Sequence, residues 1–175
     1  MKIQGKHYKT IWLKEGSPEI IQVIDQRKLP FQFEIVDLTS VDDVFFAISE
    51  MVVRGAPLIG VTAAYGIYLG VLNFKGGDFK KYIKQIADYL KSSRPTAVNL
   101  AFAVDKMTEF VFENQNEPEL VQKVLQKAVK LKESEEEFSD KIGEFGLEII
   151  EKIYKQKKQT VNILTHCNAG WPPVS

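Results

Sequence analysis

Three stretches of the chain place a polar or reactive side chain directly before the expected start of a helix. Arg54 stands in VVRGAP, Arg94 in SSRPTAVN and Cys167 in THCNAG. The N-terminus of a helix presents free N–H groups and a partial positive charge, and it therefore binds anions. Two arginines at such positions would suit a phosphate group, because a guanidinium makes paired hydrogen bonds to its oxygens. Either arginine taken alone is also consistent with a surface residue that pairs with a carboxylate.

Cys167 is the only cysteine of the chain, and it follows the apolar run 161–164. If a helix followed, the N–H groups at its start would favour the thiolate form of Cys167. The alternative is a buried structural cysteine. The adjacent His166 does not make a Cys–His pair, because neighbouring residues of a strand point to opposite faces. A metal site needs three or four ligands, and we expect neither a metal nor another cofactor.

The elements that must position these residues fall into a β-rich part and a helical part. Three short runs rich in Ile, Val and Phe, separated by turn residues, predict a small antiparallel meander within residues 1–39. Residues 40–156 carry the apolar spacing of about five helices. The first of these begins with a capping-box pattern at Ser40 and Asp43. The meander is too small to be stable alone, and we expect it to pack on the helices as one domain.

The second helix, from Pro57 to about Leu72, is expected at the centre of the bundle. It contains several glycines, each of which costs up to about 1 kcal/mol relative to alanine in a helix. Close packing against neighbouring helices would offset this cost. Pro57 and Pro95 are both suited to the first position of a helix, because the N–H that proline lacks would be unpaired there.

A long helical region is predicted from Glu119 to about Tyr154, with the charged run KESEEE as a solvated face. The apolar run 160–164 then predicts a β-strand with no partner in the helical layer. A single apolar strand needs a sheet, so residues 157–175 are expected to begin a second domain that is cut short. The two consecutive prolines of the final WPPVS stop regular structure, which also favours a truncated chain.

Composition excludes several classes of function. The chain has 175 residues, enough for one domain with a real core, and its net charge is zero. It therefore lacks a field that would attract nucleic acid or an acidic membrane, and we expect neither as a partner. The first residues contain no apolar leader, and one cysteine fits a reducing compartment. A cytoplasmic location is the expectation.

The same stretches carry a family resemblance. The segments VIDQRKLP, MVVRGAPLIGVTAAYGIYLG, SSRPTAVNLAFAVDKM, KIGEFGLEII and NILTHCNAG resemble, in order and spacing, those of 5-methylthioribose-1-phosphate isomerases. The resemblance covers about residues 10–170. The wider superfamily includes the regulatory subunits of translation initiation factor 2B and the ribose-1,5-bisphosphate isomerases. RGAP and SRPTAVN are similar to the methylthioribose branch.

The resemblance implies an enzyme that converts an aldose 1-phosphate into a ketose 1-phosphate in methionine salvage, a route of methionine biosynthesis. It implies that Arg54, Gly55, Ala56 and Arg94 bind the sugar phosphate and that Cys167 is catalytic. It also implies a homo-oligomer, which is a dimer in the full-length family.

The implied fold is α+β: a small N-terminal antiparallel sheet, a helical bundle, and the first strand of a truncated Rossmann-like domain. In the family that domain supplies a catalytic aspartate, so this chain alone is expected to be inactive. The alternative is a non-catalytic regulatory or binding subunit of the translation initiation factor 2B type.

Overall fold

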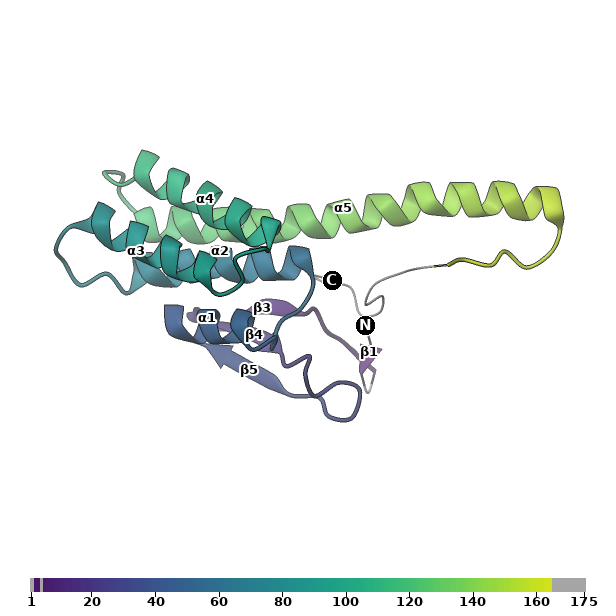
Figure 1. Cartoon of the computed structure of the whole chain (residues 1–175), viewed down its shortest axis with the longest axis horizontal. Coiled ribbons are helices and arrows are strands. Elements are labelled where there is room, and N and C mark those ends of the chain that lie inside the picture. The colour runs from purple at the N-terminus through teal and green to yellow at the C-terminus, as the bar shows by residue number, and fades with distance from the viewer. Residues whose placement is uncertain (1, 4, 165–175) are drawn as a thin grey trace.

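The computed structural model describes residues 2–3 and 5–164. A small β-sheet lies on one side of a helical bundle, and the last helix extends far beyond the bundle (Figure 1). We refer to the sheet and the bundle together as the body. The expected α+β architecture, with the meander packed on the helices, is confirmed.

The sheet is an antiparallel meander of β3 (Ile11–Lys14), β4 (Ser17–Ile24) and β5 (Ile35–Leu38). Ile21 in the central strand pairs with residues of both neighbours, Leu13 and Leu38. A further hairpin of β1 (Lys2–Ile3) and β2 (Lys6–His7) precedes it and was not predicted, because two-residue strands leave no periodic pattern.

The described residues form five α-helices, as the apolar spacing predicted. They are α1 (Val41–Ser49), α2 (Ala56–Leu72), α3 (Phe79–Ser92), α4 (Val98–Glu113) and α5 (Leu120–Lys157). The predicted capping box is present at α1, because the Asp43 N–H donates to Ser40 Oγ over 3.1 Å and the Ser40 N–H donates to Asp43 Oδ2 over 3.0 Å. Helix α4 begins at Val98 and not at Pro95, because the Ala97 N–H donates to the Arg94 carbonyl and closes a separate turn there.

Helix α2 lies at the centre of the bundle, as predicted, and contacts the other four helices and strand β4 (Figure 1). Every residue from Leu58 to Val71 is buried. A Cβ atom added at Gly66 would lie 2.9 Å from Leu90 Cδ1 and 2.9 Å from Val44 Cγ1. The glycines of α2 therefore allow α1 and α3 to approach closely, which offsets their low helix propensity.

The charged run in the middle of α5 was predicted to be a solvated face, and this is wrong for Lys132 and Glu136. The Glu136 side chain is 16% exposed, and its carboxylate lies 2.6 Å from Lys9 Nζ and 3.1 Å from Lys132 Nζ. Burial raises the pKa of Glu136, but the hydrogen bonds from Lys9 and Lys132 outweigh it and hold the pKa below its ordinary value. This ion pair joins the segment before β3 to α5.

The second half of α5 projects from the body, and residues 160–164 follow it without helix or strand pairing. The predicted strand over 160–164 is therefore wrong for the described residues. A strand is stabilised by hydrogen bonds to a neighbouring strand, and none of the described strands pairs with this segment. Leu164 is 98% exposed.

Candidate active site

Arg54 lies in the connection between α1 and α2, directly before the first turn of α2. Gly55 is the N-cap residue and has a φ of 99°, a value that favours glycine. No side chain caps this helix, so the N–H groups of its first turn are available to a ligand. Arg54 is half-buried, and its Nε atom is buried without a hydrogen-bond partner in the part of the chain that the structure describes. The guanidinium and the N–H groups at the helix start can therefore both donate hydrogen bonds to a bound anion.

Arg94 also lies before a helix, but a separate turn stands between it and α4. It is half-buried and opens the turn that ends at Ala97, the N-cap residue of α4. Ala97 has no side chain that could cap the helix, so the first N–H groups of α4 are also available.

The two helix starts meet, because α2 and α4 pack against each other near their N-termini. A Cβ atom at Gly60 would lie only 2.9 Å from the Asn99 carbonyl oxygen. A hollow of about 20 Å³ lies at this contact, lined among others by Pro57, Asn99 and Glu135. It has room for a water molecule but not for a sugar phosphate, so a larger ligand would lie on the surface beside it. Pro57 of the RGAP segment and Asn99 of the SRPTAVN segment thus line the same hollow, and the joint binding of a phosphate by the two segments stays a prediction.

The loop after β4 supports the Arg54 segment from the side of the sheet. The Gln26 N–H donates to the Val52 carbonyl over 2.9 Å. Asp25 is 1% exposed and accepts two hydrogen bonds from the Arg27 guanidinium, at 2.9 and 2.7 Å. No role was predicted for Gln26, Asp25 or Arg27, although an acid and an arginine two residues apart directly after an apolar strand are a signal for an ion pair.

We expect Asp25→Asn to lower the free energy of unfolding by about 2 kcal/mol at neutral pH, because buried hydrogen bonds between charged groups are lost. The Arg27 hydrogen bonds hold the pKa of Asp25 below its ordinary value of 3.8, although burial opposes them. The folded protein therefore keeps Asp25 ionised to lower pH than the unfolded chain does. This contribution is complete above the unfolded pKa and is lost as the pH falls through the folded pKa.

Urea unfolding of both proteins at neutral pH and at about pH 3 measures this difference. The difference in free energy of unfolding between wild type and Asp25→Asn should be smaller at the lower pH. Asp105→Asn is the matched control, since Asp105 is 63% exposed and pairs with Lys91 on the surface, and it should change stability by less than about 0.5 kcal/mol. An Asp25→Asn difference that is independent of pH would contradict the role of the ionised carboxylate.

Cys167 lies outside the described residues, so its predicted place beside the two arginines is not tested. Within residues 2–3 and 5–164, no group of three His, Cys, Asp or Glu side chains could hold a metal ion. No helix of this described part is both long and apolar enough to cross a membrane.

Curated relatives match nearly the whole length of this chain in sequence. It is 46% identical over 98% of its length to the methylthioribose-1-phosphate isomerase of Desulfatibacillum aliphaticivorans. It is 43% identical over 98% of its length to the enzyme of the same name from Escherichia coli O45:K1. The chain covers 47% and 45% of these two relatives, respectively, and so spans about half the length of the curated relatives that it matches.

Two solved structures share the fold. The 5-methylthioribose 1-phosphate isomerase of Pyrococcus horikoshii OT3 superposes with a TM-score of 0.66 at 31% identity, over 74% of this chain and 37% of that one. The delta subunit of translation initiation factor eIF-2B from A. fulgidus superposes with a TM-score of 0.70 at 33% identity, over 82% of this chain and 42% of that one.

The profile of a protein family described as the Initiation factor 2 subunit family matches residues 52–172. This range is more than half of the chain, and it contains Arg54, Arg94 and Cys167 together with the helices α2 and α4. The chain therefore belongs to the Initiation factor 2 subunit family.

Proposed function

We propose that this chain is the N-terminal, phosphate-binding part of an aldose–ketose isomerase that converts 5-methylthioribose 1-phosphate into 5-methylthioribulose 1-phosphate in methionine salvage. The observation that carries the proposal is the meeting of two uncapped helix starts, each preceded by a half-buried arginine. The names of the curated relatives, at 46% and 43% identity, support the choice of substrate.

The chemistry of the substrate explains the need for such a site. The anomeric carbon of an aldose 1-phosphate bears the phosphate, so the sugar ring must be opened with acid or base help before isomerisation. A proton or hydride then moves between the first two carbons. Arg54 and Arg94 would hold the phosphate by charge-assisted hydrogen bonds, with backbone N–H groups at Gly55 and Ala56 completing its binding. Cys167 would act on the reacting carbons.

The proposed reaction needs an acid–base group and an enclosed site, and the described residues provide neither. Catalysis by acid and base requires groups held within hydrogen-bond reach of the substrate in a site closed to water. The hollow between α2 and α4 is too small to enclose a sugar phosphate. Asp105 pairs with Lys91 and Asp140 is exposed, so neither is placed as the acid that the resemblance implies. We therefore expect the missing groups from the half of the relatives that this chain does not match.

A second candidate is a non-catalytic subunit of the initiation factor type. The observation in its favour is the TM-score of 0.70 with the eIF-2B delta subunit, which is above the 0.66 with the isomerase. Such a subunit has no need of Arg54, Arg94 and Cys167 together, and the presence of all three favours the isomerase.

Reconstitution tests the proposal. The chain would be mixed with the unmatched C-terminal half of the Desulfatibacillum relative, and the ketose product would be assayed. We expect no turnover by the chain alone and measurable turnover by the mixture. Arg54→Ala should lower kcat/KM of the mixture by about 10- to 100-fold, because a charged hydrogen bond to the phosphate is lost. The kcat/KM of Arg54→Lys should lie between those of wild type and Arg54→Ala, since lysine keeps the positive charge but lacks the planar guanidinium that binds two phosphate oxygens.

Lys123→Ala is the control, because Lys123 is a partly exposed cation of α5 that already pairs with Glu117. It should leave kcat/KM unchanged. A mixture in which Arg54→Ala is as fast as wild type would contradict the phosphate role of Arg54. Robust turnover by the chain alone would contradict the need for a second half.

A further inference from the structure

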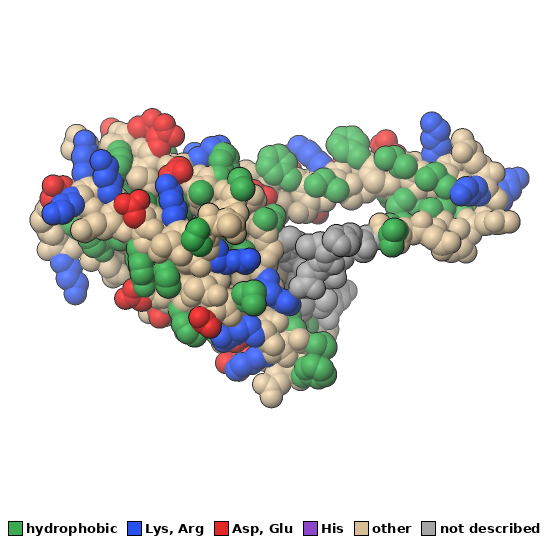
Figure 2. All heavy atoms as spheres, in the orientation of Figure 1, with side chains coloured by type: hydrophobic (Ala, Val, Ile, Leu, Met, Phe, Trp, Pro, Cys, Tyr) green, Lys and Arg blue, Asp and Glu red, His purple; other side chains and the backbone are tan. Residues whose placement is uncertain are grey.

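Glu135 of α5 is a half-buried acid at the hollow between the starts of α2 and α4. Within residues 2–3 and 5–164, its carboxylate makes no ion pair and accepts no hydrogen bond. On the face that Figure 2 shows, acidic and basic side chains are interspersed over the bundle, and the two acids that follow it, Glu136 and Glu137, both pair with lysines. A carboxylate that loses part of its hydration without a hydrogen bond in return costs free energy. This cost makes Glu135 a candidate for binding a ligand.

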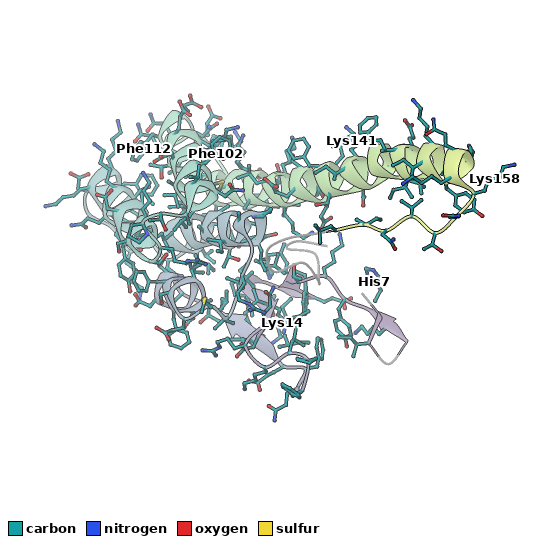
Figure 3. The ribbon with its side chains drawn as sticks, turned by 45° about the vertical axis from the view of Figure 1, so that its right-hand side comes forward. His7, Lys14, Phe102, Phe112, Lys141 and Lys158 are labelled. Atoms are coloured by element: carbon teal, nitrogen blue, oxygen red, sulfur yellow. The ribbon has the colours of Figure 1, made fainter. Side chains whose placement is uncertain are left out.

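The hollow takes its lining from three helices, α2, α4 and α5, and Glu135 is the one charged residue among the described residues that line it. Of the others, only Asn99 has a polar side chain. Phe102 of α4, which also lines the hollow, lies near the point where α5 leaves the bundle (Figure 3). The volume of about 20 Å³ has room for one water molecule, so it equally admits one hydroxyl group but not a sugar ring.

The position of Glu135 beside the proposed phosphate site restricts the group that it can bind. A carboxylate has only hydrogen-bond acceptors, and the same holds for the oxygens of a phosphate dianion, so the two repel each other and cannot share a hydrogen bond. A sugar hydroxyl can donate. In an aldose 1-phosphate, the hydroxyl on carbon 2 is next to the carbon that bears the phosphate. With the phosphate at the two helix starts, this hydroxyl is the donor nearest to the hollow.

We propose that the 2-hydroxyl of the sugar phosphate enters this hollow and donates a hydrogen bond to the Glu135 carboxylate. The inference rests on the proposed function, because it needs the phosphate at the starts of α2 and α4. Glu135 is then a specificity-determining residue: it favours a phosphate with a hydroxyl on the neighbouring carbon and repels an anion that lacks one. Its role is recognition, and the groups that transfer protons are still expected from the unmatched half of the relatives.

Binding of three phosphate compounds to the chain tests this role. Ribose 1-phosphate, 2-deoxyribose 1-phosphate and inorganic phosphate share the phosphate group, and the first two differ only in the 2-hydroxyl. Titrations followed by NMR measure the Kd of each compound, even where binding is weak, and they need no turnover. Wild type should bind ribose 1-phosphate about 10-fold more tightly than 2-deoxyribose 1-phosphate, because the deoxy compound cannot make the hydrogen bond to the charged acceptor.

Glu135→Ala should abolish this preference by weakening the binding of ribose 1-phosphate alone. The same change should tighten the binding of inorganic phosphate by about 2- to 3-fold, since a nearby negative charge is removed. Glu135→Gln should keep part of the preference, because its amide oxygen still accepts a hydrogen bond. Alanine and glutamine are good helix formers, so circular dichroism should not change.

Glu137→Ala is the matched control. Glu137 lies two residues further along the same helix, is 62% exposed and does not line the hollow. It pairs with Lys141, which Figure 3 shows on the half of α5 that projects from the bundle. The three Kd values of Glu137→Ala should equal those of wild type.

Arg54→Ala separates this inference from the proposed function. It should weaken the binding of all three compounds to a similar extent, because they share the phosphate. If it does so but wild type binds the two sugar phosphates equally well, the role of Glu135 is overturned and the phosphate site stands. A preference for ribose 1-phosphate that persists in Glu135→Ala would also overturn that role. If Arg54→Ala weakens none of the three, or wild type binds none, the phosphate site itself is overturned.

Discussion

Cys167→Ala is expected to lower kcat of the reconstituted isomerase by about 100- to 10,000-fold, with little change in KM. The reason is that phosphate binding and the chemical step are proposed to depend on different residues. The arginines before α2 and α4 would hold the phosphate, whereas the thiol of Cys167 would act on the carbons that exchange hydrogen. Removal of a group that acts only in the transition state lowers kcat and leaves ground-state binding intact.

The measurement is a steady-state assay of the ketose product with wild-type, Cys167→Ala and Arg54→Ala chains, each mixed with the same C-terminal half. Cys167→Ser is the conservative variant, and it should recover part of the rate, because a hydroxyl can still exchange a proton but ionises less readily than a thiol. Arg54→Ala should instead act mainly on KM. A Cys167→Ala enzyme with normal kcat would remove the catalytic role of Cys167 and leave the phosphate site standing.

Gly66→Leu is expected to lower the free energy of unfolding by about 3 kcal/mol or more. Gly66 lies in the middle of α2, where a single Cβ atom would already come within 2.9 Å of both Val44 Cγ1 and Leu90 Cδ1. Val44 is fully buried and branched at Cβ, so it cannot turn away without disturbing α1. A leucine adds three further carbon atoms to this contact, and extra atoms in a packed core cost about 1 to 3 kcal/mol or more.

Gly143→Leu is the matched control, because Gly143 is also a helical glycine and a Cβ atom there meets nothing within 4 Å. This change should raise the free energy of unfolding by up to about 1 kcal/mol, since leucine has the higher helix propensity. Urea unfolding followed by circular dichroism measures both variants. Equal effects at the two positions would contradict the packing role of the α2 glycines.

Local signals explain what could be predicted about the site. Arg54 and Arg94 were found because each precedes a break in an apolar helical pattern, and such breaks are visible in the sequence itself. The support from Gln26 could not be found in that way. That support is a hydrogen bond from the Gln26 N–H to the Val52 carbonyl. Any residue types at these two positions could form such a backbone contact, so the sequence does not indicate it. The position of Cys167 relative to these residues stays a prediction.

Three elements could be predicted from local signals: the three-strand meander, the capping box at Ser40 and the central helix α2 with its small residues. Each depends on residues within a few positions of one another, where propensity and periodicity act. The ion pair between Glu136 and Lys9 and the separate turn at Arg94 before α4 became visible only in the folded chain. The same holds for residues 160–164, which pair with no described strand. The packing of segments far apart in the sequence sets the partner of a side chain and the neighbour of a strand, and the residue types at one position do not encode that packing.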